Sequence, residues 1–346
     1  MSNLSVMVTG DKGYIGSVLT EVLLQRGYQV TGLDTGYYAD CLLTPQEPVY
    51  QSLRRDLRDV QPEDLRGLDS IVHLAALSND PLGELSPGLT EQINLQATLR
   101  LATLAREIGV RRFVYASSQS MYGVAATDAE LDEDTSDKNP VTSYARTKWS
   151  AELRLKELAN DAFTVVCLRP STVFGASPRL RCDIVFNNFV ACAYTTGRIE
   201  IKSDGTPWRP VVHIRDVCAA FLAGLEAPAA VVGGRSYNVG LPDGNFTVRQ
   251  LAESAAAAVP GSTLTFTGEH GSDARTYRVS FARILGELAE WYQPSWTLER
   301  GAAELVSLFR DAGFTEADFR GRKTNRLAQL KALGDSSRLD AELRWR

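Results

Sequence analysis

Residues 8–16, Val-Thr-Gly-Asp-Lys-Gly-Tyr-Ile-Gly, place three glycines between two segments of different character. The preceding residues 4–8 form an apolar run typical of a buried strand, and residues 15–26 have the amphipathic periodicity of a helix. A glycine-rich turn between a strand and a helix is typical of a pyrophosphate site, because backbone N–H groups and the helix dipole both face the phosphates. The stretch therefore predicts a dinucleotide-binding turn.

Each glycine of this turn has its own expected role. Gly10 makes the tight turn, Gly13 leaves room for the cofactor, and Gly16 lets the helix pack closely on the strand. A second apolar run at residues 29–33 ends in Asp34, where this fold places the adenosine ribose. A carboxylate there accepts both ribose hydroxyls and repels a 2′-phosphate, so NAD is predicted rather than NADP. The alternative interpretation of Asp34 is a solvated residue at a strand end.

The composition favours a protein that works on a small molecule. The chain has 346 residues, 44% of them hydrophobic and 23% charged, as expected for a globular protein with two domains or lobes. Its net charge is -5 and it has no long basic run, so neither nucleic acid nor a membrane is predicted as a partner. Five scattered cysteines and three histidines indicate neither a disulfide framework nor a metal site, and they favour a cytoplasmic protein with reduced cysteines.

Short apolar runs alternate with helical periods in the first half of the chain. Strands are expected near residues 4–9, 28–34, 49–53, 70–75, 112–117 and 163–168, and helices near residues 15–26, 89–108 and 143–159. This alternation predicts a Rossmann-type α/β fold with a doubly wound parallel sheet. Later in the chain, Asp216 is expected to cap a helix at residues 217–226.

The weaker alternation beyond Pro170 indicates a second, smaller unit. We predict an NAD-binding Rossmann domain from residues 1–174 with 211–239. Residues 175–210 with 240–346 are predicted to form a mixed α/β substrate lobe, which ends in a surface-packed appendage from about Arg320.

Tyr144 and Lys148 are four residues apart at the start of a predicted helix, so both side chains lie on one face. A tyrosine has an ordinary pKa of about 10, and a neighbouring ammonium group favours the phenolate. Tyr144 is therefore a candidate general base, although this spacing also arises by chance in structural helices.

The apolar strand predicted at residues 112–117 leads into Ser117, Ser118 and Ser120. Ligands bind at the carboxyl ends of strands in open α/β sheets, where a serine can hydrogen-bond a substrate oxygen. Serines that end a strand are also ordinary turn residues.

With these motifs in this order, residues 4–300 resemble the extended short-chain dehydrogenase/reductase family, in its nucleotide-sugar epimerase and dehydratase branch. The resemblance implies Ser118 as the catalytic hydroxyl, Tyr144 as base, and Lys148 as the residue that holds the nicotinamide ribose. It implies cofactor contacts at Gly10, Gly13, Tyr14, Ile15, Gly16, Asp34, Asp56, Leu57, Leu74, Ala75, Ala76, Asn94, Tyr144 and Lys148.

The same resemblance implies substrate contacts at Ser78, Ser118, Ser120, Thr172, Asn188, Arg209 and Arg275. Arg209 matches an arginine that grips the substrate diphosphate in the family, and the planar guanidinium fork suits that role. A surface ion pair is the alternative for Arg209 and for Arg275. Thr172 stands where many members of the family have asparagine.

Gln119 and Ser120 depart from the family pattern. Related 4,6-dehydratases carry Asp and then Glu at these positions, and the sugar-acid decarboxylases carry Glu at the second. Elimination of water needs a second acid/base pair, which an amide and a hydroxyl do not supply. The resemblance therefore implies an NAD-dependent nucleotide-sugar epimerase that acts through a transient keto-sugar, commonly at C4, and that forms a homodimer through residues 89–108 and 143–159.

Two other functions remain open on the sequence. A reductase of keto-sugar nucleotides would use the same residues and consume NAD(P)H at each turnover. A non-catalytic dinucleotide sensor would keep the fold without the chemistry.

Overall fold

A seven-stranded parallel sheet forms the centre of the protein. The computed structural model describes residues 4–44, 49–124, 129–268 and 276–346. The strand order is β3-β2-β1-β4-β5-β7-β11, and every neighbouring pair is parallel. The strands are β1 Ser5–Thr9, β2 Gln29–Asp34, β3 Gln51–Arg54, β4 Ser70–His73, β5 Arg112–Ala116, β7 Thr164–Pro170 and β11 Ser236–Val239. The predicted doubly wound Rossmann sheet is confirmed.

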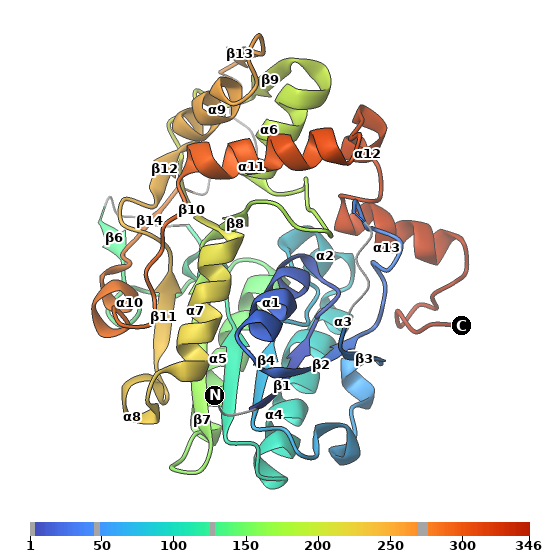
Figure 1. Ribbon diagram of the computed structural model, residues 1–346, viewed down its shortest axis with the longest axis vertical. Coiled ribbons are helices and arrows are strands. Elements are labelled where there is room, and N and C mark those ends of the chain that lie inside the picture. The colour runs from blue at the N-terminus through green and yellow to red at the C-terminus, as the bar shows by residue number, and fades with distance from the viewer. Residues whose placement is uncertain (1–3, 45–48, 125–128, 269–275) are drawn as a thin grey trace.

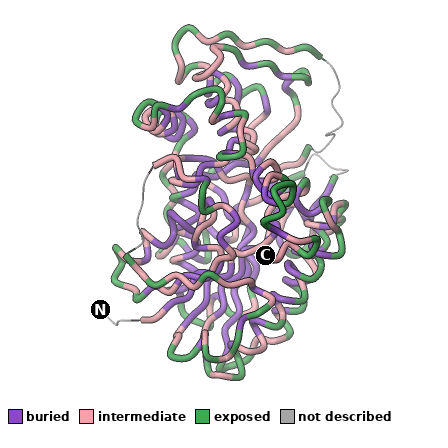
Figure 2. Tube along the Cα trace, turned by 90° about the vertical axis from the view of Figure 1, so that its right-hand side faces the viewer, coloured by how far each residue is buried: buried purple, intermediate pink, exposed green. Residues whose placement is uncertain are grey.

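Helices cover both faces of this sheet (Figure 1). On one face lie α1 (Tyr14–Gln25) and α7 (Ile214–Glu226), and on the other lie α4 (Thr98–Glu107) and α5 (Ser143–Leu158). Side chains of the inner strands alternate between the two layers of helices. Val8 packs with α1 and α7, and Met7 packs with α4 and α5. The inner strands are buried on both faces, which is why their sequences are almost continuously apolar. Figure 2 shows this buried centre.

The helix expected at residues 89–108 is not a single regular α-helix. It consists of α3 (Pro87–Glu91), a π-helical segment (Gln92–Ala97) and α4. Asn94 lies in the π-helical segment, where its side chain pairs with the backbone of Leu77. Such segments are frequent at functional sites, and hydropathy alone does not distinguish them from an α-helix.

The predicted second lobe, in the upper part of Figure 1, is built mainly from segments before α7 and after β11, two elements that return to the central sheet. Its smaller sheets pair β10 with both β8 and β12, β9 with β13, and β6 with β14. These strands are β6 Glu130–Leu131, β8 Thr172–Phe174, β9 Arg198–Ile201, β10 Trp208–His213, β12 Asn245–Thr247, β13 Thr263–Phe266 and β14 Arg278–Val279. The longer helices of the lobe are α6 Val185–Thr196, α9 Val248–Ala257 and α11 Leu298–Asp311. Short helices are α2 Asp80–Leu85, α8 Ala229–Val232 and α10 Ala282–Glu287, with 3-10 turns at Leu57–Asp59, Pro62–Leu65 and Gln119–Tyr122.

The prediction that Asp216 caps a helix was wrong. Helix α7 begins earlier, at Ile214, and the His213 side chain caps it by accepting from the Arg215 N–H at 3.3 Å. Asp216 lies within the first turn, and its carboxylate accepts the N–H groups of Ser295 and Trp296, each at 3.1 Å. The carboxylate therefore anchors a distant loop.

The C-terminal segment returns to the Rossmann domain after α12 (Glu316–Arg320). Helix α13 (Arg326–Asp335) packs beside the loop that follows β2, and its Leu330 and Leu333 share a small core with Tyr37 of that loop. Within the described ranges, no helix has both the length and the apolar character needed to cross a membrane.

Candidate functional site

The glycine turn forms the floor of a cleft of about 950 Å³ at the carboxyl ends of β1, β2 and β4. Gly10 has φ +76°, a value that favours glycine, and a Cβ on Gly16 would lie 2.0 Å from the Gly10 carbonyl oxygen. Gly13 is the N-cap of α1 and makes no side-chain capping bond. The first N–H groups of α1 therefore remain suited to a phosphate, as the sequence predicted.

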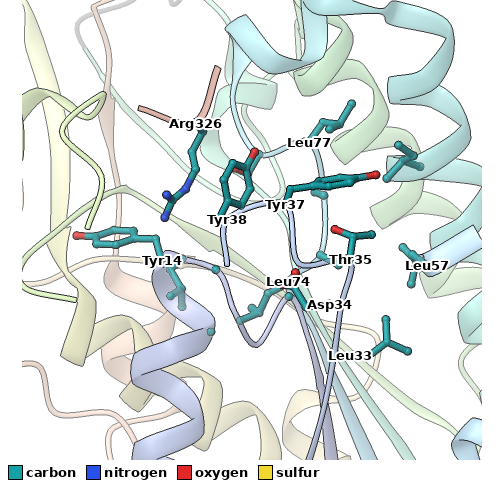
Figure 3. A pocket seen from close by; sticks show the side chains of 18 of the residues that line it. Tyr14, Leu33, Asp34, Thr35, Tyr37, Tyr38, Leu57, Leu74, Leu77 and Arg326 are labelled. Carbon is teal, nitrogen blue, oxygen red and sulfur yellow. The ribbon is translucent and has the colours of Figure 1, made fainter. Parts of the chain in front are cut away.

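Asp34 lies in the wall of this cleft (Figure 3). Its carboxylate accepts the Gly36 N–H at 2.6 Å and the Lys12 N–H at 3.3 Å. Burial raises the pKa of Asp34, while these backbone hydrogen bonds oppose the shift. The strand-end carboxylate is thus fixed beside the glycine turn and fits an adenosine ribose.

Most of the expected cofactor residues lie around this cleft. They are Gly10, Gly13, Tyr14, Ile15, Gly16, Asp34, Asp56, Leu57, Leu74, Ala75 and Ala76. The Tyr14 hydroxyl points away, donating to the Gly175 carbonyl at 2.8 Å and accepting from Asn187 at 3.0 Å. Asn94 is not in the wall: its amide accepts from the Leu77 N–H at 2.8 Å and donates to the Leu77 carbonyl at 3.1 Å. Asn94 therefore fixes a wall residue from behind.

Ser118, Tyr144 and Lys148 meet in a second cleft, of about 1310 Å³, which shares its inner wall with the first. Thr142 caps α5 by accepting the Ala145 N–H at 3.1 Å, so Tyr144 lies in the first turn and Lys148 one turn later. The Lys148 Nζ donates to the Ala116 carbonyl at 2.7 Å. The strand end and the helix start therefore bring the three side chains together.

Burial dominates the electrostatics of this triad. It lowers the pKa of Lys148 to about 7, and it raises the pKa of Tyr144, where a hydrogen bond with Ser118 opposes the rise. The Lys148 ammonium lies 6.0 Å from the centre of the Tyr144 ring. The phenol is thus held protonated until a positive charge near it favours the phenolate.

A buried ion pair between Glu152 and Arg169 contacts the segment that carries Ser117 and Ser118. The Glu152 carboxylate accepts from Arg169 at 2.6 Å and from the Ser117 hydroxyl at 2.5 Å. The Gln119 amide donates to the Arg169 carbonyl at 3.0 Å, and its buried Oε1 has no hydrogen-bond partner in the described part of the chain. Gln119 therefore acts as a structural amide beside the second cleft.

The expected substrate residues divide into three groups. Ser78, Ser118, Ser120, Thr172 and Arg209 line the second cleft. Asn188 does not, because its amide donates to the Cys182 carbonyl at 2.9 Å. Arg275 lies outside the described residues.

Sequence reasoning missed three arginines in the walls, of which Arg55 lines the first cleft. Arg181 lines both clefts and forms a two-pronged ion pair with Asp183, at 2.9 and 3.1 Å. Arg326 reaches the first cleft from α13. The sequence signal for Arg181 was only an arginine-rich stretch after Pro178, and Arg326 had none. Among the described residues, no group of three or more His, Cys, Asp or Glu side chains is placed to hold a metal ion.

The fold and the two adjoining clefts define a dinucleotide-dependent enzyme of the short-chain dehydrogenase/reductase class. The sequence pattern of the NAD dependent epimerase/dehydratase family matches residues 6–240. The chain belongs to this family.

Similar proteins catalyse several reactions. The chain is 30% identical to a UDP-glucose 4-epimerase of Mycolicibacterium smegmatis over 325 residues, which cover 89% of this chain and 99% of the relative. It is 27% identical to UDP-glucuronic acid decarboxylase 1 of Arabidopsis thaliana, covering 92% of this chain and 72% of that protein. The solved structure of MoeE5 in complex with UDP-glucuronic acid and NAD is 26% identical, with a TM-score of 0.74 over 89% of this chain and 99% of that one.

Proposed function

We propose that this protein is an NAD-dependent nucleotide-sugar epimerase that acts at C4 through a transient keto-sugar. The observation that carries the proposal is the meeting of Ser118, Tyr144 and Lys148 in the cleft that adjoins the glycine turn and Asp34. The glycine turn, the uncapped start of α1 and the strand-end carboxylate fit NAD, whose nicotinamide accepts a hydride and returns it.

The side chains then have separate tasks. Tyr144 accepts the proton of the sugar hydroxyl, and the Ser118 hydroxyl holds the same oxygen through the reaction. Lys148 stabilises the phenolate and is held in place by the Ala116 carbonyl. The second cleft holds the sugar while the keto-sugar rotates, so that its opposite face is presented to the nicotinamide.

Positions 119 and 120 favour epimerisation over the reactions of related dehydratases and decarboxylases. The Gln119 amide is bonded to the Arg169 carbonyl, and the Ser120 hydroxyl is 2.9 Å from that of Ser118. Neither supplies a carboxylate for a second proton transfer. A single base is sufficient for oxidation and re-reduction at one carbon.

We propose a nucleoside diphosphate sugar as the substrate. Arg209 lies in the wall of the second cleft, where a guanidinium suits a diphosphate. Arg275 is proposed as a second contact. UDP-glucose and UDP-glucuronic acid are the first sugars to test, because similar proteins bind or convert them.

The decisive experiment follows sugar stereocentres by proton NMR with purified protein and substoichiometric NAD, while absorbance follows NADH. Inversion at C4 without net NADH is the expected result. Consumption of NADH with a keto-sugar, and no inversion of ordinary nucleotide sugars, would instead establish the reductase.

We further propose a homodimer in the cytoplasm. The helices expected at the dimer interface are α3, α4 and α5, and Leu153 of α5 is 44% exposed although it is apolar. Sedimentation that shows only monomer at micromolar concentration contradicts the dimer. The cytoplasmic location is supported by five free cysteines, four of them buried.

A further inference from the structure

Arg326, at the start of α13, has one buried nitrogen with no partner among the described residues. The side chain is only 2% exposed. Its Nη2 donates to the Arg179 carbonyl at 2.6 Å, and its guanidinium lies 4.5 Å from the centre of the Tyr38 ring. The Nη1 nitrogen is buried and has no hydrogen-bond partner among the described residues, although the Arg326 side chain lines a cleft.

That cavity is the first cleft. Arg326 lines it together with Gly10, Gly13 and Gly16 of the phosphate-binding turn. In Figure 3 the guanidinium of Arg326 points into the space between Tyr14 and Tyr38. The Arg326 side chain and the start of α1 therefore line the same cleft.

The charged groups around Arg326 leave its positive charge without an acidic partner among the described residues, which favours the binding of an anion. Arg181 lines the same cleft and repels the guanidinium, and the nearby Asp183 is already engaged by both prongs of Arg181. No ion pair of Arg326 is formed within the described part of the chain. A buried guanidinium without an acid partner is costly, and a bound phosphate removes that cost.

We propose that Arg326 binds the pyrophosphate of NAD, so that the C-terminal segment closes the cofactor site opposite the glycine turn. This inference deepens the proposed function, since it rests on the NAD site, but it does not depend on which sugar is processed. A guanidinium fits this role because its donors form a planar fork that matches phosphate oxygens.

Contacts made by residues after Arg326 fix the C-terminal segment beside the adenosine half of the cleft. The Gln329 amide donates to the Tyr37 carbonyl at 2.9 Å, and the Trp345 indole donates to the Thr35 carbonyl at 2.7 Å. Arg344 lies 3.5 Å from Asp56. The C-terminal segment is therefore held next to the cofactor cleft by contacts with the loop after β2 and with Asp56.

The test measures binding without any sugar, by calorimetry on full-length protein stripped of nucleotide. Arg326→Gln is expected to weaken NAD and ADP-ribose by about 10- to 100-fold and to leave adenosine affinity nearly unchanged. Arg326→Lys keeps the charge without the fork and should fall between wild type and Arg326→Gln. Lys331→Gln is the matched control, because it removes one positive charge from an exposed position of the same helix.

The outcomes separate the possibilities. If wild-type protein binds neither NAD nor ADP-ribose, the proposed function fails as well. If it binds both and Arg326→Gln binds them equally well, only the inference fails. An equal loss of adenosine binding also overturns it, since that indicates a structural role.

A second measurement needs no variant. Saturating NAD should slow amide hydrogen exchange in α13 of the wild-type protein, and unchanged exchange there would overturn the closure.

Discussion

Tyr144 shows how one side chain depends on its neighbours for its chemistry. Burial raises the pKa of its phenol, and the hydrogen bond with the Ser118 hydroxyl opposes the rise. The phenol is therefore protonated in the free protein and must lose its proton before it can act as a base. Sequence spacing predicted that these side chains meet, because a strand end and a helix start at fixed positions in a Rossmann fold lie at the same edge. Arg181 and Arg326 could not be predicted in this way, since the segments that carry them reach the clefts only through the packing of parts of the chain that are distant in sequence.

Replacing Tyr144 by phenylalanine tests this chemistry. Tyr144→Phe should lower kcat by about 10²- to 10⁴-fold, because the base is lost while the ring and its packing remain. Steady-state kinetics on the active nucleotide sugar, with NAD binding measured in parallel, check the effect. Tyr194→Phe in α6 is the control and should keep full activity. Retention of wild-type kcat in Tyr144→Phe contradicts the assignment of Tyr144 as the general base.

Lys148 gives a prediction about pH. Burial lowers its pKa from the ordinary 10.5 to about 7, so the unfolded chain binds a proton more readily than the native protein between these values. Stability conferred by the wild-type side chain is therefore lowest below about pH 7 and recovers as the pH rises, by at most about 1.4 kcal/mol per pH unit. Lys148→Met abolishes this dependence.

The measurement is denaturant unfolding of cofactor-free wild type and Lys148→Met at about pH 7 and about pH 9. The wild type should gain free energy of unfolding relative to the variant at the higher pH. Parallel curves for the two proteins contradict the lowered pKa.

At the scale of single elements, the turn between β1 and α1 depends on one close approach. A Cβ on Gly16 would lie 2.0 Å from the Gly10 carbonyl, so Gly16→Ala must displace α1 and should cost about 1–3 kcal/mol as well as NAD affinity. Gly286→Ala in α10 is the control, because a Cβ there meets nothing within 4 Å. Thermal unfolding and NAD titration measure both effects, and unchanged binding in Gly16→Ala would contradict the role of the turn.

Sequence periodicity predicted elements better than their irregularities. The strands β1, β2, β4, β5 and β7 lie close to the predicted ranges because a parallel strand buried on both faces leaves a long apolar run. The π-helical segment at Gln92–Ala97 was missed, since its hydropathy is that of an α-helix. The His213 cap was missed for another reason. Aspartate is the more common capping residue, but the Asp216 carboxylate accepts hydrogen bonds from the backbone N–H groups of Ser295 and Trp296 instead.

At the scale of the whole molecule, the two predicted domains share one hydrophobic core. A single cluster of buried residues runs from Val18 of α1 through Val217 of α7 to Leu251 of α9, in the predicted substrate lobe. The return of the C-terminal segment to the Rossmann domain adds a further connection that composition did not reveal. A shared core couples the stability of both parts, so the chain should unfold in one cooperative step.

Leu251→Ala tests that coupling from the lobe. The side chain is fully buried, so its truncation should cost about 2–5 kcal/mol and lower the midpoint of a single calorimetric transition. Val49→Ala, at a position 85% exposed, is the matched control and should leave the midpoint nearly unchanged. Two transitions, of which only one shifts in Leu251→Ala, would show that the domains unfold independently. A single shifted transition means that the lobe and the glycine turn unfold together. NAD, which binds at the turn, should then raise the midpoint of this transition in the wild type and in the variant.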